Sequence, residues 1–409
     1  MLNHPAVLAY AWGEIYLGAG VETRRSRIAP AFEALERIRS TLLLELASGP
    51  GSRTVAMPPV TLDRVQRSVL APGELLLLAW TSNERSWLLA VSRDTAVSLP
   101  LPQDSKLDRD VNLLREAIAA KPALGADAID RMLADAGERL LGPVVPLLRR
   151  YSRVIVVPAG SLQRLPFEAL RLPLGRGGAL APLGVTHVVA RSPSASVLAL
   201  ARSRTRARNG DLALLAVANP RGPGGRALPG ALAEVRALEA RYRGVRALEA
   251  PRDAETALAA MTGAAAVHVA AHADFDPVSP WRSALQLADG PPVRARDLLA
   301  RKLGPEVVVL AACETAGGTM RGTGGMEGLS TAVICAGARG VVATLWPVDD
   351  ALARRFVSVF YEEAERAPDA GTALTRARAA VYADGAAARD WAAFTLVGDP
   401  AARLRLVRK

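Results

Sequence analysis

The sequence is poor in cysteine, lysine and aromatic residues. Its 409 residues include two cysteines, Cys313 and Cys335, and phenylalanine, tryptophan and tyrosine together make up 4%. Two cysteines cannot form a disulfide framework, and these two are not arranged as ligands of a metal site. Free thiols in a reducing compartment are the simplest interpretation, so we expect a cytoplasmic protein.

Long apolar runs are also missing. No run in the sequence approaches the ~18–20 residues that a membrane-spanning helix needs. The first residues, MLNHPAVLAYAWGEIY, have no basic start and carry a glutamate within their apolar part, which is not typical of a signal peptide. We expect no membrane association, and the length suggests two to three domains.

The positive charge of the chain comes almost entirely from arginine. The formal net charge is +11, and only Lys106, Lys121, Lys302 and Lys409 are lysines. A basic chain can bind nucleic acid or acidic partners. The arginines are scattered, however, and aromatic stacking platforms for single strands are scarce. We interpret them as solvated helix faces and do not expect nucleic acid as a partner; nucleic-acid binding, with its steep salt dependence, is the alternative.

Nucleotide-binding loops and nucleophile elbows are not found. GGTMRGTGG (residues 317–325) lacks the Gly-Lys-Ser/Thr ending of a phosphate-binding loop. NPRGPGGR follows an expected strand, but its prolines do not fit a dinucleotide-binding turn. PAGSLQ and ARSPSAS do not match Gly-x-Ser-x-Gly. The sequence therefore predicts no cofactor.

Apolar runs alternate with helical patterns along most of the chain. We expect a helical segment over residues 1–57, then two α/β parts, 58–205 and 206–409. The expected elements include paired strands ELLLLAW and SWLLAVS, a helix over 163–171, a strand over 185–191 and a helix over 349–366. Two expected strands, RVIVVPAG and DLALLAVA, are predicted to be buried, and the other expected strands are GVRALEA, AAVHVAAH, SALQLAD, EVVVLAAC and RGVVATLW. This alternation favours a mostly parallel sheet with helices on both faces.

Two of these strands end in reactive side chains. AAVHVAAH ends at His272, and EVVVLAAC ends at Cys313. In open parallel sheets ligands bind at the carboxyl ends of the strands, so neighbouring strands would present an imidazole and a thiol at one edge. A nearby imidazole can take the proton of a thiol and leave a nucleophilic thiolate.

Simpler interpretations stand beside this one. A cysteine at a strand end is often a small buried hydrophobic residue, and we expect this of Cys335 inside TAVICAGA. His268 and His272 lie on one face of their strand and form a possible metal-binding pair. No third ligand is evident, so we expect no metal.

The ordered motifs around these residues resemble the CHAT protease family. This caspase-like family is associated with tetratricopeptide repeats and belongs with caspases, separases and gingipains. The similarity covers about residues 60–409, and ALERIRSTL resembles the helix that often links such repeats to the domain. The matching segments are LLGPVVPLL, VIVVPAGSLQRLPFEAL, RSPSASVLAL, LPGALAEVRAL, VHVAAHADFD, SALQLAD, VVVLAACETAGG, GMEGLSTAVICAGARGVVATLWPVDD, FVSVFYEEA and WAAFTLVGDP.

The resemblance implies a caspase-like three-layer αβα fold and a cysteine endopeptidase. His272 matches the second histidine of the family's H-x-A-x-H-G pattern, and Cys313 matches the nucleophile of S-A-C-E-T-G. The backbone N–H groups of Cys313 and Ala273 would form the oxyanion hole. Ala273 stands where the family has glycine, and alanine resists a positive φ. Residues 58–205 would be a non-catalytic half and 206–409 the catalytic half.

Acidic residues around the motifs are candidates for the substrate pocket. Relatives that cleave after arginine or lysine use such residues, although an aspartate or glutamate can equally cap or orient a loop. The candidates are Glu314, Asp274, Asp276, Glu327, Asp349 and Asp350. We expect residues 317–325 to be a loop that gates the cleft.

The expected partners are a protein substrate and an activating protein that binds the N-terminal helices. Relatives act in bacterial defence or cell death, which suggests the same setting here. The alternative is a catalytically degenerate caspase-like scaffold that only binds partners. Repeats themselves are absent from the sequence, so we expect either a short member of the family or a fragment of a longer repeat-containing protein.

Overall fold

The computed structural model describes residues 17, 20–48, 58–82, 84–119, 125–204, 212–221, 228–276, 278–299, 301–311 and 328–409. Within them, the chain forms two compact units, the first reaching Leu200 and the second starting at Ala201. No described helix is both long and apolar enough to cross a bilayer.

The first unit is built on a mixed sheet. Its strand order is β3-β2-β1-β4-β7. β1 pairs antiparallel with β2, as the ELLLLAW and SWLLAVS pattern predicted, and parallel with β4. All residues of β1 and β2 are buried, which is why these strands are apolar throughout rather than alternating. The strands are β1 (Glu74–Trp80), β2 (Ser86–Val91), β3 (Ala96–Leu101), β4 (Arg153–Val157) and β7 (Val188–Arg191).

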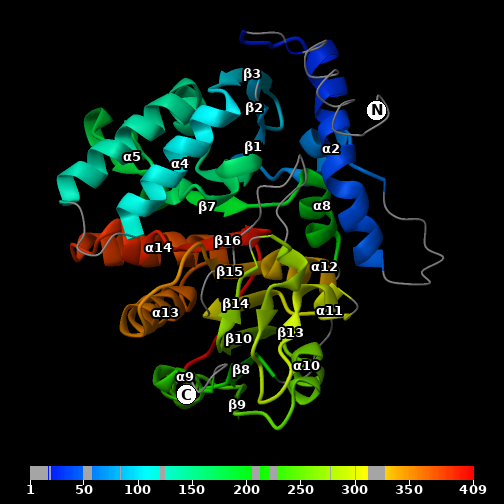
Figure 1. Ribbon diagram of the computed structural model, residues 1–409, viewed down its shortest axis with the longest axis vertical. Coiled ribbons are helices and arrows are strands. Elements are labelled where there is room, and N and C mark those ends of the chain that lie inside the picture. Colours follow the sequence, from blue (N-terminus) through cyan, green and yellow to red (C-terminus); the bar gives the residue numbers. More distant parts are fainter. Residues whose placement is uncertain are drawn as a thin grey trace. The chain divides into compact units, whose positions relative to one another are not determined.

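Helices lie on both sides of this sheet. In Figure 1, α4 and α5 lie on one side, and α2 and α8 on the other. α2 packs Phe32 and Leu35 into the core of this unit. The buried carboxylate of Glu36 accepts hydrogen bonds from the first backbone N–H groups of α8, at Ala195 and Ser196. The helices are α2 (Arg25–Ser48), α3 (Leu62–Arg64), α4 (Asp104–Ala119), α5 (Ala126–Leu141), α6 (Val145–Leu148), α7 (Leu183–Thr186) and α8 (Ala195–Ser203).

The sheet of the second unit has the order β16-β15-β14-β10-β8-β9. The pairs from β9 to β15 are parallel, and β16 is antiparallel to β15. Apolar residues fill the central strands, whose positions are buried apart from Ala311 at the end of β14. The strands are β8 (Leu214–Ala218), β9 (Val245–Glu249), β10 (Ala266–Ala270), β14 (Val307–Ala311), β15 (Gly340–Thr344) and β16 (Phe394–Gly398).

Helices also cover both faces of this second sheet. Figure 1 shows α9, α13 and α14 on one side and α10, α11 and α12 on the other. Three of them begin at aspartates whose carboxylates accept backbone N–H bonds: Asp253 for α10, Asp349 for α13 and Asp369 for α14. The helices are α9 (Pro229–Arg241), α10 (Ala254–Thr262), α11 (Ala295–Leu299), α12 (Leu329–Ala336), α13 (Asp350–Ala364), α14 (Ala370–Ala383) and α15 (Ala388–Trp391).

The expected mostly parallel sheet between two helical layers is confirmed, but several local predictions are wrong. Residues 163–171 form two short 3₁₀ turns, Gly160–Arg164 and Phe167–Ala169, rather than a helix, because Pro166 interrupts the segment. The strand expected over 185–191 begins only at Val188 and follows the helix α7.

A buried ion-pair network fixes the end of β16. Asp399 is fully buried and pairs with Arg202, at 3.0 Å, and with Arg339. Arg339 also contacts Glu306 at 3.2 Å. Gly398 has φ 98°, and a Cβ there would lie 2.4 Å from the carbonyl oxygen of Arg339. The Gly-Asp pair of WAAFTLVGDP therefore ties β16 to the start of β15.

We predict that Asp399→Asn lowers the free energy of unfolding by about 3 kcal/mol, because both arginines lose their buried carboxylate. Chemical denaturation followed by circular dichroism measures this. The matched control is Asp384→Asn, which removes an exposed pair with Arg355 and should cost about 0–1 kcal/mol. Equal losses in the two variants would contradict the assigned role of Asp399.

Candidate active site

β10 and β14 carry the two candidate catalytic segments. They are parallel neighbours in the sheet, and Ala270 is in register with Ala311. His272 follows Ala270 by two residues, and Cys313 follows Ala311 by two residues in the sequence. Cys313 itself lies outside the described residues. The structure thus places His272 at the carboxyl end of the strand next to the one that leads to Cys313.

A small sheet holds the backbone around His272. The N–H of Gln286 donates to the carbonyl oxygen of His272 at 2.9 Å. The next residue, Ala273, starts β11 (Ala273–Asp274), which pairs antiparallel with β12 (Ala284–Leu285), and β12 pairs with β13 (Val293–Arg294). Ala250 is the one non-glycine residue with positive φ among those described. Ala273 therefore has negative φ, a conformation that alanine adopts without strain.

His272 lines a cavity of about 70 Å³ at the carboxyl ends of the strands. The His272 side chain is largely buried, at 9% exposure. Ala311 and Thr344, the last residues of β14 and β15, line the same cavity. The other lining residues are Leu228, Ala271, Val348, Asp350, Ala353 and Phe394.

The acidic candidates for the substrate pocket have different positions in the structure. Asp350, at the start of α13, lines the cavity with His272. Its carboxylate lies against Gly230 in the first turn of α9, where a Cβ would come within 2.3 Å of Oδ2. Asp349 instead caps α13 by accepting from the N–H of Ala351, at 3.0 Å. Adjacent aspartates thus have different surroundings.

The remaining acidic candidates do not line this cavity or lie outside the described residues. Asp274 is exposed on β11. Asp276 accepts from the N–H groups of Val278 and Ser279, and the bond from Ser279 is the main cause that lowers its pKa. Glu314, Glu327 and the expected gating loop at 317–325 fall outside the described part of the chain.

Cys335 is a core residue, as predicted. It lies in α12 with 2% exposure. Burial raises the pKa of its thiol to about 12, although the nearby Arg204 guanidinium acts in the opposite direction. A thiol in this environment is not a nucleophile at neutral pH.

His268 contacts side chains of two helices. It is fully buried on β10, and its Nδ1 lies 3.1 Å from the hydroxyl of Tyr361. Its Nε2 lies 2.7 Å from Oε1 of Glu234. No cluster of three potential metal ligands occurs among the residues that were placed.

Sequence reasoning missed Thr344 and Phe394 as cavity residues. Thr344 ends the strand RGVVATLW, so the rule that sites form at the carboxyl ends of parallel strands could have indicated it. Phe394 starts β16, whose antiparallel direction brings its first residue to that same edge. No local signal gives the direction of β16.

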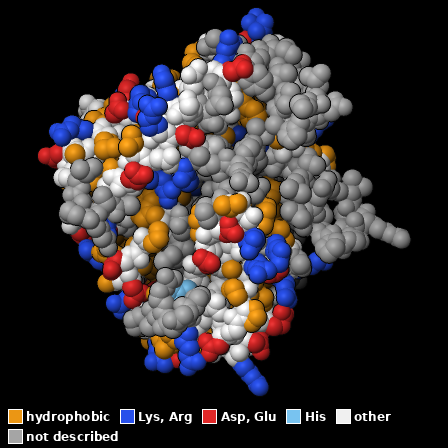
Figure 2. Space-filling view, viewed as in Figure 1, with side chains coloured by type: hydrophobic (Ala, Val, Ile, Leu, Met, Phe, Trp, Pro, Cys, Tyr) orange, Lys and Arg blue, Asp and Glu red, His pale blue; other side chains and the backbone are white. Residues whose placement is uncertain are grey.

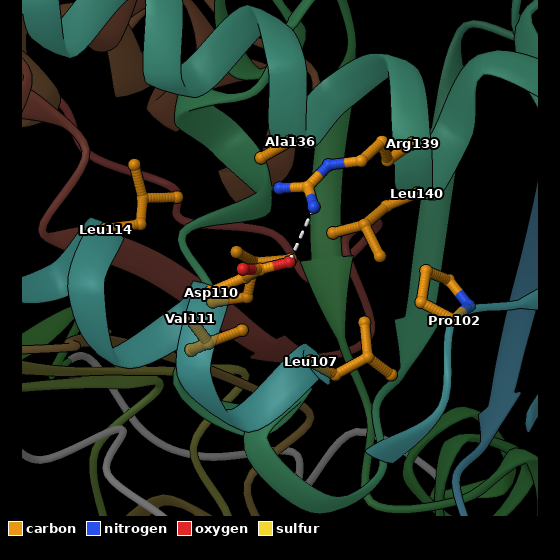
Figure 3. A pocket seen from close by; sticks show the side chains of 9 residues that line it. Pro102, Leu107, Asp110, Val111, Leu114, Ala136, Arg139 and Leu140 are labelled. Carbon is orange, nitrogen blue, oxygen red and sulfur yellow. Dashed lines mark hydrogen bonds and ion pairs between the residues drawn. The ribbon is translucent and has the colours of Figure 1, made fainter. Parts of the chain in front are cut away.

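A cavity in the first unit offers no comparable site. It lies between α4 and α5, and Arg139 reaches across it to Asp110 at 2.7 Å, as Figure 3 shows. Its volume is about 10 Å³, which is about enough for a single water molecule. We interpret it as a packing gap.

Comparisons with known proteins agree with this architecture. The family model named "CHAT domain" matches residues 130–399. Mouse tetratricopeptide repeat protein 28 is 34% identical over 119 residues, which are 27% of this chain and 5% of that protein. The chain therefore spans only a small part of this curated relative.

Two solved structures show similarity to this chain. Separase of Saccharomyces cerevisiae, solved with securin, has a TM-score of 0.59 at 11% identity over 90% of this chain and 33% of that chain. This likeness shows a shared caspase-like fold. The Arg-specific cysteine proteinase gingipain R (RgpB) of Porphyromonas gingivalis has a TM-score of 0.45 at 12% identity, over 74% of this chain and 76% of its own.

We predict that Cys335 resists alkylation in the folded protein. In the variant Cys313→Ala, Cys335 is the one remaining thiol. A pKa of about 12 leaves very little thiolate at pH 8, so iodoacetamide should label it only after unfolding in guanidinium. Mass spectrometry measures the labelling, and rapid modification of the native variant would show that the burial is wrong.

Proposed function

The chain belongs to the CHAT domain family, and on that premise we propose that it is a cysteine endopeptidase. In this proposal Cys313 is the nucleophile and His272 is the general acid and base. The catalytic half is residues 206–409, and residues 58–205 form a non-catalytic half.

One observation carries the proposal: His272 and Ala311 line the same cavity, at the ends of paired parallel strands. Cys313 follows Ala311 by two residues, so the chain length keeps the two Cα atoms within about 7 Å of each other. This reach is compatible with the proposed dyad, in which the thiol acts at the strand edge where His272 lies. The alternative thiol, Cys335, is buried and has a raised pKa.

The chemistry follows from the two side chains. The imidazole of His272 takes the thiol proton, and the Cys313 thiolate attacks a peptide carbonyl carbon. The N–H groups of Cys313 and Ala273 stabilise the resulting oxyanion. His272 then protonates the leaving amine as the C–N bond breaks, which leaves a thioester. Water, deprotonated by His272, hydrolyses this thioester and regenerates the thiol.

Asp350 supports a preference for arginine or lysine before the cleaved bond. It is the one carboxylate among the described residues that line the cavity, and its Oδ2 lies 4.0 Å from Nε of Arg354, so the pairing is loose. A cationic substrate side chain would gain a charge-assisted hydrogen bond to it. Asp349, engaged as a helix cap, is not available for this role.

A protein partner would control the protease. We place its binding site on the N-terminal segment, residues 1–57, and we propose a cytoplasmic setting in bacterial defence or cell death. The yeast separase structure was solved as a complex of separase with securin. A catalytically silent scaffold is the other outcome of the tests below.

The surface charge does not favour nucleic acid as the main ligand. On the face shown in Figure 2, Lys and Arg side chains are interspersed with Asp and Glu side chains. Many arginines are already paired, such as Arg236 with Glu249 and Arg301 with Glu255. A single basic stripe would be expected for phosphate binding.

We predict that Cys313→Ala and His272→Ala each lower cleavage of a cognate protein substrate on the order of 10³-fold or more, because each removes a reacting group. Gel-based cleavage assays with the activating partner present measure this. Cys335→Ala is the matched control and should keep its activity. Cleavage that survives the loss of Cys313 would refute the peptidase assignment.

We predict that Asp350→Asn lowers kcat/KM for peptides with arginine before the cut by about 10- to 100-fold, the equivalent of about 1.5–3 kcal/mol. Peptides with leucine at that position should change little. Fluorogenic peptide series measure the ratio. Asp349→Asn is the control from the same loop, and an arginine-to-leucine ratio that does not change in Asp350→Asn would exclude Asp350 from substrate recognition.

A further inference from the structure

A second and larger cavity lies between α9 and α13. Its volume is about 220 Å³, roughly three times that of the cavity beside His272. Its lining positions recur at helical spacing, which shows that one face of α9 and one face of α13 form the walls. The lining residues are Ala233, Glu234, Ala237, Leu238, Arg241, Tyr242, Arg354, Val357, Ser358 and Tyr361.

Glu234 lines this cavity, and its buried Oε1 has no hydrogen bond. Its side chain is 9% exposed, and its Oε1 lies 2.7 Å from Nε2 of His268. Despite this short distance, the geometry is misdirected, and neither atom has a hydrogen bond to any partner in the structure. A buried carboxylate oxygen without a hydrogen bond is costly, and a donor from a ligand would relieve that cost.

Arg241 is already matched by acidic partners, whereas Arg354 is exposed and only loosely paired. Arg241 pairs with Glu362 at 2.8 Å and with Glu365 at 3.0 Å. Arg354 lies 4.0 Å from Asp350. Within the described chain, the ion-pair partner of Glu234 is His268, which is charged only when protonated. The group that lacks a permanent opposite charge is therefore a carboxylate, and a cation complements it.

The walls suit a cation on an aliphatic stem. Leu238 and Val357 are apolar, and the rings of Tyr242 and Tyr361 lie side by side with centroids 6.4 Å apart. Aromatic rings attract cations, and apolar walls take up methylene groups. We infer that the cavity between α9 and α13 binds an organic cation, an ammonium or guanidinium on a short aliphatic stem, whose head group reaches Glu234.

The position of the cavity links it to the candidate active site. Leu228, directly before α9, and Asp350 and Ala353 of α13 line the cavity with His272. His268 lies four residues before His272 on the same chain segment. A bound cation that bridges α9 and α13 would act on the helices that border His272. This coupling rests on the proposed function, whereas the binding itself does not.

Two sources can supply such a cation: a free small molecule or the side chain of a peptide. The test uses the full chain carrying Cys313→Ala, so that no peptide is cleaved. Calorimetric titrations with agmatine represent the free cation. Titrations with a short capped peptide containing arginine represent the side chain, and the same peptide with the neutral isostere citrulline is its control.

We expect agmatine or the arginine peptide to bind and the citrulline peptide not to bind. Glu234→Gln should weaken that binding about tenfold or more, because it removes the charge but keeps the shape. Glu255→Gln, which removes an exposed carboxylate on α10, is the matched control and should leave the affinity unchanged. Binding of only one probe identifies the source.

Three results would overturn the inference. The first is that neither probe binds. The second is that Glu234→Gln binds the probe with unchanged affinity. The third is that binding is lost in Asp350→Asn and kept in Glu234→Gln, which would place the ligand in the cavity with His272. If Glu234→Gln does not fold, Ser358→Trp replaces it, since Ser358 is an exposed lining residue and a bulky side chain there obstructs the cavity. If the wild-type protein shows no proteolytic activity, this result refutes only the coupling between the cation cavity and the active site. The binding of the cation is measured without cleavage and is judged separately.

Discussion

The parallel register between β10 and β14 is the constraint on which the candidate site depends. Ala270 faces Ala311, and both strands end at the edge where His272 lines a cavity. A slip of β10 by one residue would exchange its two faces and would take His268 away from Tyr361 and Glu234, which disfavours other registers. The antiparallel β16 brings Phe394 to the same edge, and the start of α13 adds Asp350.

Buried polar groups decide the arrangement around this sheet. His268 lies between Glu234 of α9 and Tyr361 of α13, so one strand residue contacts both helices of that face. Asp399 joins the end of β16 to Arg202 and Arg339. Ion-paired groups such as Asp399 contribute little net stability compared with apolar packing, but they penalise any arrangement that leaves them unsatisfied.

The helix pair α9 and α13 borders two chemically different cavities. At their first turns, Asp350 and Leu228 join His272 around a small space. Further along, Glu234 and two tyrosines surround a larger one. Gly230 permits the close approach at the first turns, because a Cβ there would overlap the Asp350 carboxylate. The same two helices therefore border both cavities, which is the basis of the proposed coupling between them.

The sequence by itself determined the alternation of strands and helices, the mostly parallel sheet and the burial of Cys335, because periodicity and composition report on each segment separately. It also predicted strands that end at His272 and Cys313; β10 ends two residues before His272, and Cys313 lies outside the described residues. The helix expected over 163–171 was wrong because Pro166 overrides the apolar pattern. Only the tertiary structure decided that Asp350 lines the cavity with His272 while Asp349 caps a helix, and that His268 contacts Glu234 and Tyr361. These contacts join residues far apart in the chain, and a local pattern carries no information about them.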